Sequence, residues 1–365
     1  MTLQRLYPMV AAVILCQTAF IAGTAAACTG IAIKPTDGSV IGARTLEFAQ
    51  DLQSEIIVVP RQKEFVGTAP GDKPGLKWKT KYGSVGANAF KLPIILDGLN
   101  EKGLYVGIFY MPGYAQYQKV SPADQGKALA PWELPTYLLG TCTSVKEAVA
   151  ATQTLLVGEV VQKDFGSVPG VHYVIRDAQG QCVVLEYING ELKVHENPFG
   201  VITNAPTFDW HVTNLRNYVN MTVNNVPPVD IKGIKLAGFG QGTGMLGLPG
   251  DFTPPSRFVR AVAFSMSAMP VKTAREGVLQ AFHILNQFDI PKGAARGTED
   301  GKRVADYTQW TSAADLSNAR YYFNTYDSRR IRMIDLKKAE LDAKDIKTIS
   351  MAGDEVIDDL TNTAK

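Results

Sequence analysis

Long hydrophobic runs and an excess of one charge are both missing from this sequence of 365 residues. The formal net charge is only +2, which argues against a nucleic acid as the main partner, because such partners are held by basic surfaces. The one N-terminal apolar run is too short for a membrane span of about 20 residues, and no later stretch qualifies. We therefore expect no stable membrane insertion.

Signatures of metal and nucleotide binding are missing as well. The four histidines are scattered, without i, i+4 pairing or a nearby cysteine pair, so neither zinc nor another cofactor is predicted. His211 is interpreted as a structural residue rather than as a catalytic base. The glycine-rich run at 240–244 lacks the Lys-Ser/Thr ending of a phosphate loop. We find no internal repeat and no linker between domains.

Cysteine is scarce, with four in the chain. Residues 1–27 resemble a secretory signal, with a short positive region, an apolar run and small residues at 25 and 27. The prediction is an exported protein, periplasmic or secreted, whose mature part (28–365) is a single domain. Cleavage after residue 27 leaves an odd number of cysteines. Cys142 and Cys182 are then either a disulfide or two buried thiols, and Cys28 becomes the first residue.

An N-terminal cysteine carries a thiol and a free α-amine on one residue. The unperturbed amine pKa of about 7.7–8.0 lets this group act as a base near neutral pH. An N-terminal amine that activates its own side chain is a known form of nucleophilic catalysis. Two other interpretations of Cys28 are a lipidated anchor and a plain buried cysteine. A lipoprotein site usually has a large aliphatic residue three positions earlier, where this chain has Ala25.

The hydrophobic pattern predicts strands that alternate with blocks of helices. Strands are expected at residues 30–33, 40–42, 55–60, 93–96, 105–110, 171–176, 182–187, 191–196, 309–315, 319–326 and 330–335. Helices are expected over residues 132–156, 209–218, 256–266 and 273–286. Residues 62–80 and 220–255 are interpreted as loops, and the C-terminal residues as partly helical. This order indicates a sandwich of helices and mostly antiparallel sheets.

The first two predicted strands form a hairpin around a turn at residues 35–38, which would place Arg44 and Glu47 beside Cys28. On its own the Arg44/Glu47 pair is typical of a surface ion pair. Beside a nucleophile, the cation would lower the thiol pKa and the carboxylate would hold the amine. Residues 111–117 form an aromatic loop, suited to lining an apolar pocket or simply well packed.

Five motifs occur in order along the chain: CTG at 28–30, GARTLE at 42–47, DGLNEKGL at 97–104, ITNAPTFDW at 202–210 and PGDFTPPSRF at 249–258. Together they resemble the choloylglycine hydrolase family of linear amide C–N hydrolases, which holds penicillin V acylases and bile salt hydrolases. The resemblance covers essentially the whole chain after residue 27. It implies the α+β class, as the four-layer αββα sandwich of N-terminal-nucleophile (Ntn) hydrolases, and often a homotetramer.

The resemblance also implies roles for five residues. Cys28 matches the nucleophile, and Arg44 matches the arginine beside its thiol. Glu47 falls where the family usually has an aspartate that contacts the amine, so the carboxylate is kept but is one methylene further out. Asn204 matches the asparagine of the oxyanion hole, and Arg257 the arginine that supports the network.

Tyr110 falls where penicillin V acylases carry tyrosine and bile salt hydrolases carry asparagine, which favours the Gram-negative penicillin V acylase branch. Phe109, Met111 and Tyr114 are expected to bind the substrate with Tyr110. The expected reaction is cleavage of a small N-acyl amide through a thioester, as in penicillin V acylase. Acyl-homoserine lactone acylase and bile salt hydrolase are the alternative activities. The contrasting class is a non-catalytic, lipid-anchored binding protein with a degraded site.

Overall fold

The computed structural model describes residues 27–299 and 301–361. The predicted signal segment, apart from Ala27, lies outside the described residues. No helix within them is long and apolar enough to cross a bilayer. Cys28, Cys142 and Cys182 are all free thiols, which resolves the alternatives for the last two in favour of unpaired cysteines.

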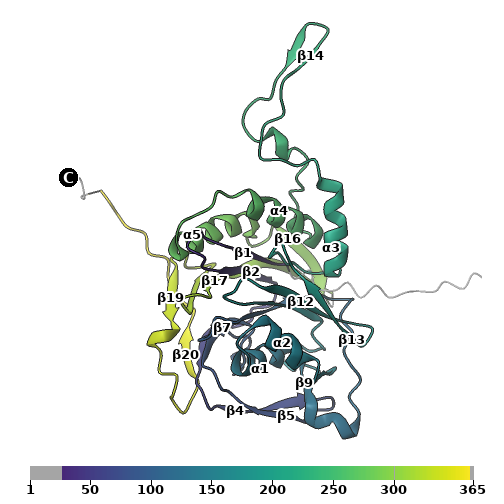
Figure 1. The fold of residues 1–365 in the computed structure, drawn as a ribbon, viewed down its shortest axis with the longest axis vertical. Coiled ribbons are helices and arrows are strands. Elements are labelled where there is room, and N and C mark those ends of the chain that lie inside the picture. The colour runs from purple at the N-terminus through teal and green to yellow at the C-terminus, as the bar shows by residue number, and fades with distance from the viewer. Residues whose placement is uncertain (1–26, 300, 362–365) are drawn as a thin grey trace, which may run out of the picture.

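Two antiparallel sheets lie face to face in the middle of the molecule (Figure 1). The first has six strands in the order β1-β2-β17-β18-β19, with β16 paired to β17. Its strands are β1 (Cys28–Ile33), β2 (Ile41–Phe48), β16 (Ala295–Glu299), β17 (Lys302–Asp315), β18 (Arg320–Thr325) and β19 (Arg332–Asp335). Every residue of β2 is buried, because both faces of this sheet are covered.

The second sheet has eight strands in the order β13-β12-β11-β8-β7-β6-β3-β20. Its strands are β3 (Glu55–Val59), β6 (Ser84–Ala87), β7 (Asp97–Asn100), β8 (Tyr105–Tyr110), β11 (Val171–Arg176), β12 (Cys182–Ile188), β13 (Glu191–Glu196) and β20 (Lys347–Ser350). The predicted three-stranded meander is confirmed as β11, β12 and β13, which pair in succession.

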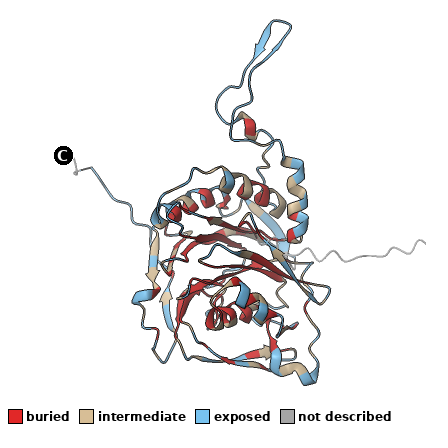
Figure 2. Cartoon of the chain, in the orientation of Figure 1, coloured by how far each residue is buried: buried red, intermediate tan, exposed pale blue. Residues whose placement is uncertain are grey.

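Helices cover the outer face of each sheet. The first sheet is covered by α4 (Pro254–Ser267) and α5 (Ala274–Leu285), and the second by α1 (Leu134–Thr141) and α2 (Val145–Thr152). Thr273 caps the N-terminus of α5, because its side chain accepts from the Glu276 backbone in a capping box. The layers therefore run helix, sheet, sheet, helix (Figures 1 and 2), and the predicted αββα fold class is confirmed.

Three local predictions are wrong. Residues 62–80 are not a loop but a hairpin of β4 (Glu64–Ala69) and β5 (Lys73–Lys79), whose bulge breaks the alternation that would signal a strand. The strand expected at residues 93–96 is absent, and β7 forms instead at residues 97–100. These residues were expected to be part of a turn, because the segment contains Gly98. A Cβ at Gly98 would lie 2.8 Å from the Gly86 Cα, so this glycine permits close strand packing. The C-terminal residues add strand β20 rather than an α-helix.

An arm projects from the helical layer that contains α4 (Figure 1). It leaves the body after α3 (Phe208–Asn214) and ends in a small hairpin of β14 (Val229–Ile231) and β15 (Ile234–Leu236). Its surface is exposed along most of its length (Figure 2). The exposed large apolar side chains on the arm are Val219, Val223, Val226, Val229, Ile231, Ile234, Leu236, Phe239 and Leu246.

Candidate active site

The hairpin of β1 and β2 brings three of the predicted site residues together. Cys28 pairs with Leu46 and Gly30 with Arg44. Because side chains alternate along a strand, Arg44 shares the Cys28 face of the sheet and Glu47 lies on the opposite face. All three are buried, with Cys28 only 4 % exposed. The sequence prediction for this pair of strands is confirmed.

Asn204 and Arg257 reach Cys28 from other parts of the chain. The Cys28 backbone N donates to Asn204 Oδ1 at 2.7 Å, and Arg257 Nη2 donates to the same oxygen at 2.6 Å. Arg257 Nη1 donates to the Cys28 carbonyl and, at 2.9 Å, to Thr29 Oγ1. Asn204 Nδ2 donates to the Tyr110 carbonyl at 2.7 Å. The strand β1, the helix α4 and the end of β8 thus meet at one asparagine side chain.

The backbone around Asn204 is held by several independent bonds. Ile202 and Gly30 exchange backbone hydrogen bonds of 2.8 and 3.0 Å. His211 Nε2 lies 2.9 Å from the Asn204 carbonyl oxygen, and burial lowers the pKa of His211 to about 4. The ring is therefore neutral at pH 7, and it can donate to this carbonyl through Nε2. This contact is the structural role that the sequence analysis gave to His211.

A second buried cluster supports the residue before Asn204. His172 Nε2 lies 3.1 Å from the Thr203 carbonyl oxygen, and its Nδ1 lies 3.0 Å from Glu186 Oε1. Burial raises the pKa of Glu186, but hydrogen bonds from His172 and His195 outweigh it and bring the pKa to about 2. Glu186 is thus an ionised anchor for the Asn204 segment.

The thiol and the carboxyl group of the site are both shifted by burial. Burial raises the pKa of the Cys28 thiol, and the nearby Arg44 charge lowers it by less, so the net shift is upward. The lowering effect expected of Arg44 is therefore present, but burial outweighs it in the chain that retains residue 27. Burial raises the pKa of Glu47 to about 7, against the lowering effects of Arg257 and of the Thr308 hydroxyl. Glu47 thus titrates near neutral pH.

Two buried polar atoms of the site have no hydrogen-bond partner within the described residues. They are Nη2 of Arg44 and Oε2 of Glu47, whereas Oε1 of Glu47 accepts from Thr308 Oγ1 at 2.9 Å. Buried polar groups are nearly always paired, so these atoms mark a place that a substrate, a water or the chain terminus can occupy. The Glu47 backbone N donates to the Ala27 carbonyl at 2.9 Å.

A cavity that is partly open to solvent lies beside the nucleophile. Cys28, Arg44 and Tyr110 all contribute to its wall. The rest of the wall is mainly apolar and includes Leu46, Phe48, Phe90, Leu96, Trp132 and Phe165. The rings of Phe48, Tyr110 and Phe165 form a triad with centroids 5.7–5.8 Å apart, within the range of aromatic pairing.

Of the four predicted substrate-binding residues, only Tyr110 lies in the cavity wall. Phe109 is fully buried and points to the other face of β8, where its ring lies 4.1 Å from Arg44 Cζ. Met111 is also fully buried, and Tyr114 is 42 % exposed outside the cavity. The prediction that these three line the pocket is wrong, because strand alternation separates neighbours and the aromatic loop turns away.

The whole arrangement was compared with known proteins. The model of the family "Linear amide C-N hydrolases, choloylglycine hydrolase family" matches residues 28–349. The chain belongs to the choloylglycine hydrolase family. This confirms the resemblance seen in the five motifs and makes the protein an enzyme of the linear amide hydrolase type.

Relatives of this chain carry names that refer to different substrates. The chain is 36% identical over 326 residues to the bile salt hydrolase/transferase of Clostridium perfringens, covering 88% of this chain and 96% of that one. It is 29% identical over 322 residues to the penicillin V acylase of Pectobacterium atrosepticum, covering 82% and 77%. Family membership therefore leaves the acyl group of the substrate open.

Solved structures of two relatives share the fold. A variant of the conjugated bile acid hydrolase from Clostridium perfringens superposes with a TM-score of 0.81 at 32% identity, over 92% of this chain and all of that one. The penicillin V acylase from Agrobacterium tumefaciens has a TM-score of 0.71 at 23% identity, over 89% and 92%. The second likeness shows the Ntn-hydrolase fold alone.

Several groups around the site were missed in the sequence. Thr308 bonds Glu47, Phe165 completes the aromatic triad, and Asp97 lies 4.0 Å from Arg44. Asp97 is the first residue of the DGLNEKGL motif. The sequence motif was therefore recognised, but no function was assigned to Asp97. No cluster of three or more metal-ligating side chains occurs in residues 27–299 and 301–361.

Proposed function

We propose that the protein is an exported N-terminal-cysteine hydrolase that removes an aromatic or other apolar acyl group from a linear amide. Penicillin V, with its phenoxyacetyl group, is the favoured substrate. The observation that supports this choice is the Phe48, Tyr110 and Phe165 triad in the cavity next to Cys28. An aromatic acyl group can pack edge-on or offset against these rings.

The proposed mechanism begins with removal of residue 27, which turns the Cys28 amide into a free amine. This amine takes the proton of the thiol as the sulfur attacks the substrate carbonyl. The raised pKa of the thiol favours proton removal during attack over a thiolate formed beforehand. The unpaired Glu47 Oε2 is available to accept from the resulting ammonium group.

Attack forms a carbon–sulfur bond and places negative charge on the carbonyl oxygen. The Asn204 amide nitrogen carries two hydrogens, and its bond to the Tyr110 carbonyl uses one. The second hydrogen stabilises the oxyanion. The carbon–nitrogen bond then breaks, and the leaving amine takes the proton held on the Cys28 amine. Water hydrolyses the thioester, which releases the acid and restores the thiol.

Bile salt hydrolysis is the second candidate. The supporting observation is the 36% identity to the bile salt hydrolase/transferase of Clostridium perfringens, together with the apolar wall of the cavity beside Cys28. Cleavage of acyl-homoserine lactones requires only a straight acyl chain in the same cavity. Tyr110, which replaces the asparagine expected in bile salt hydrolases, argues for the aromatic acyl group.

Export and self-association are part of the proposal. The family match begins at residue 28, directly after the predicted signal segment, which supports cleavage at that point. The arm presents nine exposed large apolar side chains between Val219 and Leu246. A second copy of this chain is the occupant we propose for that surface. Serine at Ile231, Ile234 and Phe239 should lower the mass measured by light scattering, whereas an unchanged mass contradicts the proposal.

The test uses protein recovered after export, with its N-terminus established by intact mass. Amine release is measured on penicillin V, on short- and long-chain acyl-homoserine lactones and on glycine- and taurine-conjugated bile acids. We expect the highest kcat/KM on penicillin V. A higher value on bile acids would transfer the assignment to the second candidate. A lipidated terminus without turnover on any substrate would indicate an anchored binding protein.

A matched pair of variants tests the aromatic triad. Phe165→Leu keeps an apolar side chain but removes a ring, and should lower kcat/KM on penicillin V by about 2- to 10-fold, the usual worth of an aromatic pair. It should change kcat/KM on a straight-chain substrate less. Phe65→Leu is the control, because Phe65 stacks on Trp78 away from the cavity. Equal losses of kcat/KM on both substrates would show that the triad does not select aromatic acyl groups.

A further inference from the structure

The proposed mechanism leaves one buried carboxylate without a role. Asp97 begins β7 and is completely buried between the sheets. Its Oδ2 accepts from Ser312 Oγ at 2.8 Å and from the Tyr321 hydroxyl at 2.7 Å, and its Oδ1 accepts from the Tyr105 hydroxyl. Three hydroxyl donors on two oxygens suit an ionised carboxylate, which only accepts.

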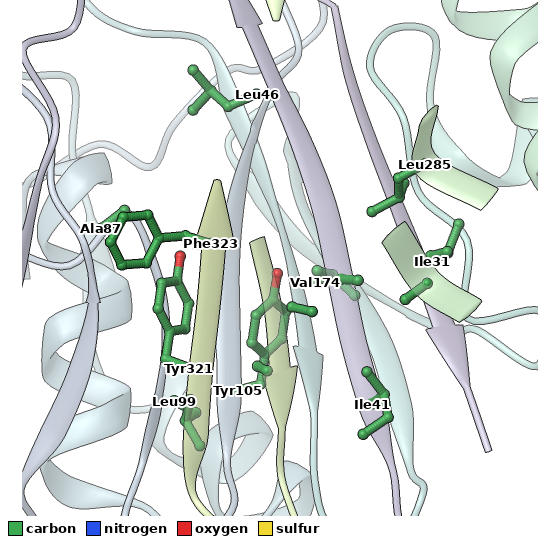
Figure 3. Close-up of a cluster of buried hydrophobic side chains, with 14 of the residues drawn as sticks. Ile31, Ile41, Leu46, Ala87, Leu99, Tyr105, Val174, Leu285, Tyr321 and Phe323 are labelled. Atoms are coloured by element: carbon green, nitrogen blue, oxygen red, sulfur yellow. The ribbon is translucent and has the colours of Figure 1, made fainter. Parts of the chain in front are cut away.

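These donors come from both sheets. Ser312 lies on β17 as the register partner of Arg44, Tyr321 lies on β18, and Tyr105 lies on β8. Figure 3 shows the Tyr321 and Tyr105 rings side by side within the apolar cluster. Burial and the Asp97 charge raise the pKa of both phenols far above their usual value. The phenols therefore stay protonated and donate to the carboxylate.

The cation nearest to this carboxylate is the one beside the nucleophile. Arg44 Nη1 lies 4.0 Å from Asp97 Oδ1, and both side chains are fully buried. Arg44 is held independently by donation to the Thr45 and Ile108 carbonyls and by the ring of Phe109. Burial lowers the pKa of Arg44, but the acidic groups around it, Cys28 first and then Asp97, together raise it by more. Arg44 thus interacts with the Cys28 sulfur and with two carboxyl groups, Glu47 and Asp97, of which Asp97 forms the ion pair at 4.0 Å.

We propose that Asp97 is a positioning residue: it is the permanent counter-ion of Arg44, and it limits how strongly that guanidinium acts on the Cys28 sulfur. While the thiol is protonated, Asp97 is the ion-pair partner that compensates the buried charge of Arg44, which would otherwise be costly. Asp97 therefore helps to keep the sulfur protonated until the terminal amine removes the proton during attack. The inference rests on the proposed role of Cys28 as nucleophile.

The first experiment measures the acidity of the thiol directly. Alkylation of Cys28 by iodoacetamide is followed across pH by peptide mass spectrometry, so no substrate is needed and an incorrect substrate assignment cannot affect the result. Asp97→Asn should lower the thiol pKa by roughly one unit, because one negative charge near Arg44 is lost. The other groups that face the sulfur, Glu47, Arg257 and the terminal amine, are unchanged. Asp177→Asn is the control, since Asp177 is equally buried and binds backbone N–H groups at Val145 and Gln181.

The second experiment asks whether the effect passes through Arg44. In the Arg44→Gln variant the Asp97 carboxylate has lost its cation and should take up a proton. Asp97→Asn then removes little charge, so in this variant it should shift the thiol pKa by less than about a third of its effect in the native chain. At pH 8, Asp97→Asn should destabilise the native chain to urea but should not destabilise the Arg44→Gln variant.

Each outcome decides the proposal. An unchanged or raised thiol pKa in Asp97→Asn would overturn it, as would an equal shift in both backgrounds. If Asp97→Asn alone does not fold, recovery of folded protein in the double variant supports the counter-ion role. Failure of both variants would show that the three hydroxyl donors, rather than Arg44, require the carboxylate, and the proposal would be wrong.

Discussion

Asn204 is the side chain through which most of the site is connected, so Asn204→Ala is the most informative substitution. It removes the acceptor of the Cys28 amine and of Arg257, at 2.7 and 2.6 Å, and it removes the donor to the Tyr110 carbonyl. It also removes the N–H that the proposed mechanism directs at the oxyanion. Alanine replaces none of these groups.

The expected loss can be divided between the ground state and the transition state. Charge on the carbonyl oxygen develops only during attack, so the lost donor affects kcat, by about 10²- to 10³-fold for one oxyanion donor. The lost acceptor leaves Arg257 Nη2 buried with one bond fewer, at a cost of about 1–3 kcal/mol in stability. Asn204 does not form part of the apolar cavity wall. We therefore expect no large change in KM.

The assay is steady-state amine release from penicillin V, or from whichever substrate the panel selects, together with urea unfolding. Asn197→Ala is the matched control. Asn197 is also buried and donates Nδ2 to the Val201 carbonyl at 2.9 Å, but it does not bond any predicted catalytic residue. It should lose stability and keep kcat. A rise in KM at constant kcat for Asn204→Ala would refute the oxyanion role.

Three further predictions address the nucleophile, the anchor and the strand contact. Cys28→Ser should reduce turnover below detection, because a hydroxyl is much harder to ionise, and retention of Ala27 should do the same by blocking the amine; activity in either form contradicts the mechanism. Glu186 has a folded pKa of about 2 against about 4.3 unfolded, so it contributes roughly 3 kcal/mol above pH 4.5 that is lost as the pH falls toward 2. The stability gap between the native chain and Glu186→Gln, measured by urea unfolding, should therefore narrow over that range. It should narrow again at higher pH, where His195 loses the proton that its bond to Glu186 helps to retain. Gly30→Ala would place a Cβ 2.7 Å from Phe109 Cζ and should cost about 1–3 kcal/mol in unfolding free energy; full stability would show that the ring moves freely.

The local sequence pattern was sufficient to predict the part of the site that lies on the hairpin of β1 and β2. The turn at residues 35–38 and the alternation on either side predict the pairing that brings Arg44 and Glu47 to Cys28, and the structure has that pairing. Asn204 and Arg257 are different, because they lie 176 and 229 residues from Cys28. No spacing in a single sequence predicts such contacts, so these two residues were identified only through the family motifs.

The remaining errors come from effects that appear only in three dimensions. Phe109 and Tyr110 are adjacent and equally aromatic, yet one supports Arg44 and the other lines the cavity. Whether a ring contacts Arg44 or lines the cavity depends on which face of β8 carries it, and that is set by how β8 packs on its partner sheet. The lowering effect of Arg44 on the Cys28 pKa is present as expected, but complete burial outweighs it, and a sequence motif contains the charge but not the burial.

The proposed cleavage before Cys28 would change only a few interactions, because the site is already assembled in the chain that contains Ala27. The Cys28 nitrogen is bound to Asn204, and its carbonyl to Arg257. Removing residue 27 takes one acceptor from the Glu47 backbone N–H and gives the Cys28 nitrogen additional hydrogens, next to a carboxylate with an unpaired oxygen. Processing on this view does not reorganise the fold. Processing supplies the Cys28 amine as the base and frees the Glu47 backbone N–H as a donor. The two arginines of the site and their counter-ions are in place before cleavage.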